Sequence, residues 1–357
     1  MQNPELRPSL SWGRVFLVAA PLAVIASAIT FIWTSSVQDD ARSALERNVL
    51  SKMLLQAVEP AGSGLVMADS DGDLVADTPP EPDSLQHPDK LVFAYIAEEQ
   101  EESPSGQNWQ ELTEAISKAV GKPVEFASFT KVNEQLEALR IGQVHIIGLS
   151  TGAAPLAVDS AGFVPLATLA QQSGDVGYEM QIMVPADSPI KETADLRGKR
   201  VVFVRPTSNS GFKAAFVYLY KREGLLPEQD YQWSFSLSHK DSIRALLKGG
   251  ADAAPVASDL LAEMIESGEV PPGALRSIYD SERFPPAVIG CAHDLPADEV
   301  ASIRNALTGF NWDGTGVQRE LGPTGAARFV EVNYKNDWAN IRRIDEAVRE
   351  VLSGDGN

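Results

Sequence analysis

Residues 201–211, VVFVRPTSNSG, decide the fold and the candidate site of this chain. Four apolar residues at 201–204 predict a buried strand, which Pro206 ends. Hydroxyl and amide side chains follow from Thr207 to Gly211, at the start of an expected helix. Free backbone N–H groups and the positive end of the helix dipole suit such a place to an oxyanion. Because Ser, Thr and Asn also cap helices that bind nothing, an anion cradle and a plain helix cap both remain open here.

The composition bounds the class of protein and its partners. The chain has 357 residues, 44% of them hydrophobic, and a formal net charge of −19. This length can bury one large core or two medium ones. So acidic a protein is repelled by nucleic acid, and no nucleic-acid partner is expected. Cys291 is the single cysteine, which excludes a disulfide within the chain and a cysteine-based metal site.

Residues 15–33, VFLVAAPLAVIASAITFIW, form an uncharged stretch long enough to span a bilayer. Arg7 and Arg14 precede it, so the positive-inside bias places the N-terminus in the cytoplasm. We expect residues 1–36 to be a cytoplasmic stub and a single-pass transmembrane anchor in the cell membrane. The binding domain would then lie on the periplasmic or extracytoplasmic side. A cleavable signal peptide is the alternative, because Ala-Ser-Ala at 26–28 resembles a cleavage site.

Residues 37–88 are expected to form a stalk helix and an acidic, proline-rich linker. Four aspartates within the linker recur at spacings of two, two and four: Asp69, Asp71, Asp73 and Asp77. Alternate carboxylates on a turning loop can converge on a hard cation, and the segment resembles a single thrombospondin type 3 calcium repeat. A structural calcium at 69–77 and a solvated acidic linker remain equal alternatives. No other cofactor is expected.

Strands and helices alternate from residue 91 onward. The expected strands lie at 91–97, 124–129, 144–150, 177–185, 201–204, 233–236 and 251–256. The expected helices lie at 109–120, 131–141, 240–248, 297–308 and 338–352. Repeated strand–helix–strand order indicates an α/β protein with mostly parallel sheets.

The segments ADLRGKRVVFVRPTSNSG (194–211) and SHKDSIRALLKGGADAA (238–254) carry a family resemblance. They resemble the phosphate, phosphite and phosphonate ABC-transporter substrate-binding proteins. The resemblance implies a two-lobed type II periplasmic-binding-protein fold, with lobe 1 at 89–184 plus 291–352 and lobe 2 at 185–290. It implies that the ligand is a small phosphorus oxyanion and that the partner is an ABC permease in the inner membrane.

The same resemblance implies a binding site shared by the two lobes. The family's Ser-Thr-Ser-Gly loop corresponds to residues 208–211, whose side chains and backbone N–H groups would hold the oxyanion. A Ser-His pair before a helix implies that His239 reaches the same oxyanion, and Tyr178 matches a cleft aromatic. The candidate ligand-binding residues are Thr207, Ser208, Asn209, Ser210, Gly211, His239, Tyr178, Thr151 and Tyr95.

Several positions depart from the family pattern, and one of them is His145, where the family usually has Asp. Val132 stands where a cleft tyrosine is common, and Thr151 stands in place of a proline-aromatic turn. We therefore expect Thr151 to supply a hydrogen bond from the first lobe. Arg205 replaces an acidic or neutral residue, so a charge beside the anion and a surface arginine both remain open. These departures affect the identity of the ligand more than the fold.

The leading hypothesis is therefore a membrane-anchored solute-binding protein that delivers a phosphorus oxyanion to an ABC importer. A tethered ligand sensor of the same fold, with no transport role, is the first alternative. An enzyme on this fold is the second, and Cys291 with His293 two residues later is its candidate pair. A lone cysteine is more simply a buried core residue, so no catalytic residue is expected.

Overall fold

The structure of the protein is a computed structural model that describes residues 67–96 and 106–353. Every described residue belongs to one compact unit of the chain. The expected transmembrane anchor, the stalk helix and the first part of the linker lie outside the described residues. Within the described ranges, no helix is long and apolar enough to cross a membrane.

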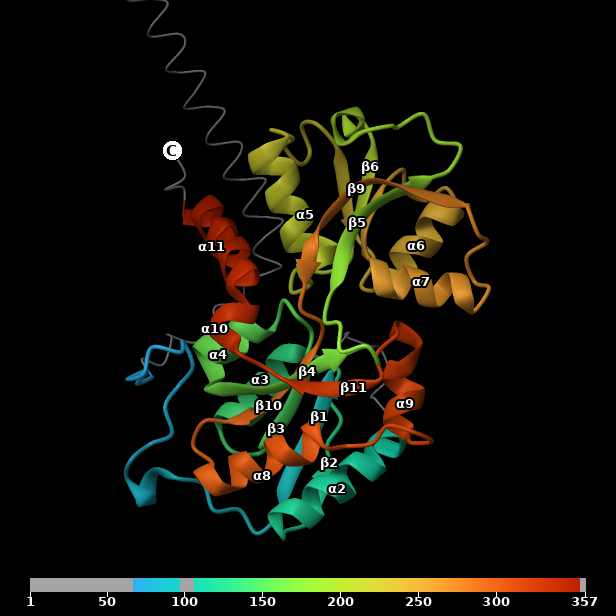
Figure 1. Cartoon of the computed structure of the whole chain (residues 1–357). Helices are drawn as coiled ribbons and strands as arrows, with labels where there is room; N and C mark the ends of the chain where they lie inside the picture. Colours follow the sequence, from blue (N-terminus) through green and yellow to red (C-terminus); the bar gives the residue numbers. More distant parts are fainter. Residues whose placement is uncertain (1–66, 97–105, 354–357) are drawn as a thin grey trace, which may run out of the picture. The chain divides into compact units, whose positions relative to one another are not determined.

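A six-stranded mixed sheet forms the first lobe, in the order β11-β4-β10-β3-β1-β2 (Figure 1). The strands β1, β2 and β3 run parallel, whereas β10 and β11 run antiparallel to their neighbours. The bounds are β1 Leu91–Ile96, β2 Val124–Phe126, β3 Ile146–Leu149, β4 Phe163–Ala170, β10 Val288–Ala292 and β11 Arg328–Glu331. Nearly all residues of β1, β3, β4 and β10 are buried, as a sheet covered on both faces requires.

Amphipathic helices cover this sheet. The helix α2 packs beside α8, and α3 packs beside α4. Gly121 ends α2 in the left-handed conformation, at φ 72°, which glycine adopts without a steric penalty. The bounds are α2 Gln110–Val120, α3 Val132–Arg140, α4 Ala154–Ala161, α8 Ala297–Thr308 and α9 Gly316–Leu321.

The second lobe contains a three-stranded antiparallel sheet, β8-β5-β9, and a parallel pair, β6-β7. A bridge between Val201 and Ala253 connects the two. Ile243, Val256 and Met264 are fully buried in the core beneath them. The bounds are β5 Tyr178–Pro185, β6 Arg200–Phe203, β7 Gln232–Phe235, β8 Ala254–Ala257, β9 Leu275–Phe284, α5 Ala214–Val217, α6 His239–Leu247 and α7 Ser258–Glu266.

Strand pairing corrects two expectations. The sheets are mixed rather than mostly parallel, because β5, β9 and β10 return along their neighbours in the opposite direction. The lobe boundaries also move. Since β5 pairs with β8 and β9, and β10 pairs with β3 and β4, the chain crosses between the lobes near residues 171–177 and 285–287. The expected boundaries at 184 and 290 cut through strands.

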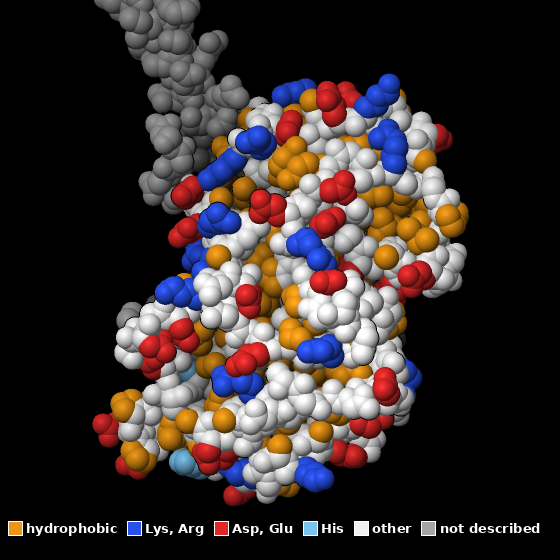
Figure 2. Space-filling view, in the orientation of Figure 1, with side chains coloured by type: hydrophobic (Ala, Val, Ile, Leu, Met, Phe, Trp, Pro, Cys, Tyr) orange, Lys and Arg blue, Asp and Glu red, His pale blue; other side chains and the backbone are white. Residues whose placement is uncertain are grey.

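Two further segments pack on these lobes. The described end of the expected linker is held to the first lobe: Val75 is buried, and Lys335 Nζ donates to the Gly72 carbonyl at 2.8 Å. At the other end of the chain, α10 (Tyr334–Asp337) leads into α11 (Ala339–Ser353). The helix α11 contacts α4 of the first lobe and α5 of the second. Basic and acidic side chains are interspersed over the face shown in Figure 2.

Candidate functional site

A cavity of about 250 Å³ has walls from both lobes. Six of the nine candidate ligand-binding residues line it: Tyr95, Thr151, Tyr178, Ser208, Asn209 and His239. Thr207, Ser210 and Gly211 are not among its wall residues. The structure therefore brings together candidates that are far apart in the sequence, and the three others build the loop around them.

The donor loop follows β6 and begins a helix, as expected. Ser208 is its N-cap, and its Oγ accepts a hydrogen bond from the Gly211 N–H at 3.1 Å. The first turn, Asn209–Lys213, is a π-helical turn, a wider form that often occurs at functional sites. A Cβ at Gly211 would lie 2.3 Å from Val204 Cγ2, so only glycine allows the helix start to approach the strand this closely. Ser208 therefore both caps the helix and lines the cavity.

His239 enters the cavity from the N-terminus of α6. Its Nδ1 accepts the backbone N–H of Ala257 at 3.1 Å, so the proton of the neutral ring is on Nε2. Nε2 lies 3.4 Å from Ser208 Oγ. Burial, and secondly the charge of Arg205, lower the pKa of His239 to about 3. At neutral pH the residue is therefore a neutral N–H donor at the cavity wall.

Tyr178 and Thr151 meet where the two lobes join. The Thr151 hydroxyl donates to the Pro285 carbonyl at 2.6 Å, and its oxygen lies 3.4 Å from the Tyr178 hydroxyl, which donates to it. In this structure the Thr151 proton is engaged by the Pro285 carbonyl, and a hydrogen bond from Thr151 to the ligand stays a prediction. Burial raises the pKa of Tyr178, and Ser210 and Thr151 oppose that rise as hydrogen-bond partners. Tyr178 is thus a protonated phenol.

Asn209 presents a buried amide to the cavity. The residue is 2% exposed, and neither amide atom has a hydrogen-bond partner of good geometry among the described residues. The same side chain also acts on Tyr178 as a weak hydrogen-bond partner, so the amide lies between the phenol and the cavity. The substitution of a family hydroxyl by Asn therefore keeps a donor in the loop.

The lobes also touch through their main chains at Gly152. A Cβ there would lie 2.4 Å from the Thr207 carbonyl oxygen and 2.7 Å from the Asn209 nitrogen. Lys213 Nζ donates to the Gly152 carbonyl and to Asp345 Oδ1, both at 2.8 Å. The turn after β3 is therefore fixed against the donor loop.

Sequence reasoning missed part of the wall. Trp109, Asp259 and Glu320 line the cavity, and Trp109 lies with its ring centroid 4.3 Å from that of Tyr95. Only the fold brings these positions to the cleft, and no local motif marks them. Arg205 also lines the cavity and is 5% exposed, which settles its position as a buried rather than a surface arginine. Val132 is buried without being a wall residue.

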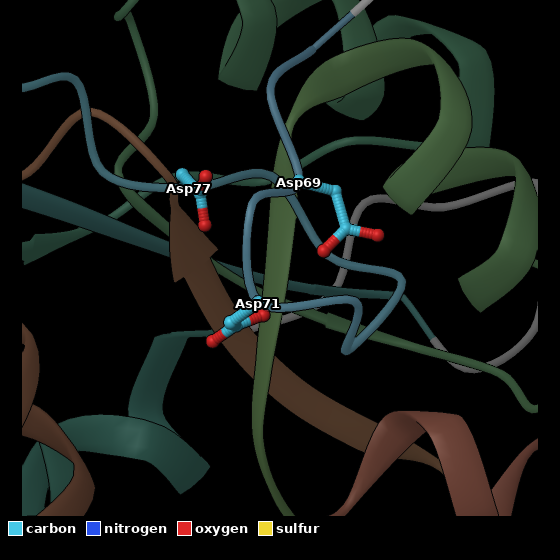
Figure 3. A group of neighbouring side chains, drawn as sticks. All are labelled: Asp69, Asp71 and Asp77. Atoms are coloured by element: carbon cyan, nitrogen blue, oxygen red, sulfur yellow. The ribbon is translucent and has the colours of Figure 1, made fainter.

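The acidic loop brings three of its four aspartates together (Figure 3). Carboxylate oxygens of Asp69, Asp71 and Asp77 lie within 4.8 Å of one another. Asp73 is outside this group and accepts the Val75 N–H at 2.8 Å. Backbone N–H groups of residues 72–74 donate to Asp69, so the main chain of the loop itself holds its shape. Calcium binding here stays a prediction.

Cys291 lies in the middle of the first-lobe sheet. The residue is fully buried in β10, and burial raises the pKa of its thiol to about 12. A thiol with so high a pKa supplies almost no thiolate at neutral pH, so it is a poor nucleophile. This argues against Cys291 as the centre of an enzyme.

Known proteins are similar to this chain in sequence and in fold. A family model described as "ABC transporter, phosphonate, periplasmic substrate-binding protein" matches residues 93–338. The phosphate-import protein PhnD of Mycolicibacterium smegmatis is 28% identical over 230 residues, which are 60% of this chain and 69% of that protein. A binding protein component of an ABC phosphonate transporter from Pseudomonas aeruginosa has a TM-score of 0.57 at 17% identity, over 74% of this chain and 97% of its own. PhnD1 from Prochlorococcus marinus, in complex with methylphosphonate, has a TM-score of 0.59 at 14% identity. The match covers 74% of this chain and 100% of that one.

Proposed function

Because the chain belongs to the family of periplasmic substrate-binding proteins of phosphonate ABC transporters, we propose that its cleft captures a small phosphorus oxyanion for an ABC importer. The ligand is a phosphonate, phosphite or phosphate. The relatives' names support this class: the protein from Prochlorococcus marinus holds methylphosphonate, and that from Mycolicibacterium smegmatis is a phosphate-import protein.

One observation carries the proposal for this chain's own site. Neutral polar side chains from separate elements line a single cavity, namely Ser208 and Asn209 of the loop, His239 of α6 and Tyr178 of β5. Neutral dipoles aimed at one point stabilise an oxyanion that has left water. Hydrogen bonds to a charged group contribute about 1.5–3 kcal/mol each, so a handful of them is enough for micromolar affinity.

A thermal-shift panel of phosphate, phosphite and methylphosphonate on the full chain tests this function. We expect at least one of these anions to raise the melting temperature, by an amount that grows with the logarithm of its excess over Kd. Ser208→Ala and His239→Ala should each weaken binding of that anion by about 1–3 kcal/mol. Ser267→Ala is the matched control, because Ser267 lies at the end of α7 and its hydroxyl bonds only the Met264 carbonyl. No shift with any of the three anions would contradict the proposal.

The place of the protein at the membrane is proposed on the same basis. The family is extracytoplasmic, and the uncharged stretch at residues 15–33 supplies a single-pass anchor in the cell membrane. The tether keeps the binding domain close to its ABC permease. This raises the local concentration of the loaded protein at the transporter.

A further inference from the structure

We propose that Arg205 makes the site select doubly charged oxyanions over singly charged ones of the same shape. This inference rests on the proposed function and adds a rule for the ligand's charge. Arg205 stands between β6 and the donor loop, three residues before Ser208. It lines the cavity while being only 5% exposed, so its guanidinium acts from a largely desolvated position.

The charge of Arg205 reaches the donors. A guanidinium stays protonated in proteins, whatever groups it contacts. Its field is felt at His239, where it acts with burial to keep the imidazole neutral. An oxyanion that accepts a hydrogen bond from His239 Nε2 would lie in the same field. Because the anion is negative, the positive guanidinium would attract it. The Coulomb energy grows with each unit of ligand charge and is stronger in a cleft than in bulk water.

The rest of the wall also carries charged side chains. Asp259, Glu263 and Glu320 also line the cavity, and carboxylates repel a dianion more than a monoanion. Lys240 Nζ lies 2.6 Å from Glu263 Oε1, so this lysine partly neutralises the charge of Glu263. Neutral hydroxyl and amide donors serve the oxygens of either charge state. Among the described wall residues, Arg205 is therefore the permanent positive charge that adjoins the donor loop.

Methylphosphonate and methanesulfonate form the test pair. Both are a methyl group on three oxygens around a tetrahedral centre, but in mildly alkaline buffer the first is a dianion and the second a monoanion. Calorimetry on the full-length protein should show methylphosphonate bound at least about tenfold more tightly than methanesulfonate. Arg205→Gln should reduce this ratio about tenfold, whereas Arg205→Lys, which keeps the charge, should retain most of it.

Lys221→Gln is the control for a general effect of charge. It removes one positive charge from the same lobe outside this cavity, where Lys221 pairs with Glu350, and should leave the ratio unchanged.

Equal binding of the two anions by the unaltered protein would overturn the inference without any variant. So would an Arg205→Gln protein that loses both affinities by the same factor, since that is a structural effect. If Arg205→Gln does not fold, a folded Arg205→Lys decides: retained preference supports the inference, and lost preference overturns it. Binding of neither anion to the unaltered protein is a failure of the proposed function instead.

Discussion

At the scale of single residues, His239 connects the site to the stability of the fold. Its pKa falls from an ordinary 6.5 to about 3 in the folded protein, mainly because the ring is buried. The unfolded chain therefore takes up a proton below pH 6.5 that the folded chain refuses until near pH 3. The contribution of His239 to the free energy of unfolding is complete above pH 6.5 and is lost as the pH falls from there.

His239→Gln should make the free energy of unfolding depend less on pH below neutrality. Between about pH 7 and about pH 5, protonation of this one histidine in the unfolded state removes roughly 2 kcal/mol from the free energy of unfolding. The variant keeps a neutral donor and lacks that titration, so its loss over the same range should be smaller by up to this amount. Urea denaturation in anion-free buffer at the two pH values measures it. The same loss in both proteins would show that His239 is not held neutral.

The sequence predicted some residues of the cavity wall and could not predict others. Ser208 and His239 each lie at the start of a helix, so local pattern and family resemblance place them. The direction of the Thr151 hydroxyl depends on the Pro285 carbonyl, 134 residues away. The burial of Arg205 likewise depends on the lobes around it. Contacts that are distant in the chain have no local signal.

At the scale of elements, α11 is joined to the second lobe by two unlike ion pairs. Lys213 and Asp345 have side chains 14% and 11% exposed, and Lys213 also bonds the Gly152 carbonyl. Lys221 and Glu350 have side chains 38% and 56% exposed. Water screens the second pair far more than the first.

Replacement of each lysine by methionine should therefore lower the free energy of unfolding by different amounts. We expect Lys213→Met to lower the free energy of unfolding by about 2 kcal/mol, since it leaves a largely buried carboxylate and a carbonyl without a donor. Lys221→Met should cost less than about 1 kcal/mol. Urea denaturation of both variants at neutral pH makes the comparison. Similar losses of unfolding free energy in the two variants would mean that burial adds nothing to the stability contributed by the Lys213–Asp345 ion pair.

Elements with strong local patterns were predictable, and others were not. The helix α8 has the predicted bounds, Ala297–Thr308, because its sequence is helical throughout and Gly309 follows it. The strand β4 contains Pro165, which weakens a strand prediction, and it was not expected. The strand β9, LRSIYDSERF, is partly polar and lacks the continuous apolar run of a parallel strand. Their antiparallel pairing is a tertiary property.

At the scale of the whole molecule, binding and anchoring should be separable. Every wall residue of the cavity lies between Tyr95 and Thr324. A chain that starts at residue 67 should therefore bind its oxyanion with the affinity of the full chain. Only the full chain, which contains residues 15–33, should float with liposomes in a density gradient. A truncated protein that floats equally well would place the membrane contact elsewhere, and one that binds more weakly would show that the first 66 residues support the site.

The architecture was predictable only as far as the resemblance extends. The order of motifs in residues 194–254 implied two lobes and a shared cleft, and the family match over residues 93–338 confirms that class of fold. The points where the chain crosses between lobes were placed wrongly. They depend on which sheet accepts β5 and β10, and an apolar strand is equally suited to either.

Gly152 has a consequence for how this protein can change over generations. At that position the first lobe meets Thr207 and Asn209 through backbone atoms, with no side chain between them. Exchange of neighbouring side chains, such as the family's hydroxyl for Asn209, therefore leaves the separation of the lobes at this point unaltered. Any residue larger than glycine at 152 would push the two main chains apart. A substitution at Gly152 should therefore disturb the contact between the lobes even when every polar side chain of the cavity is unchanged.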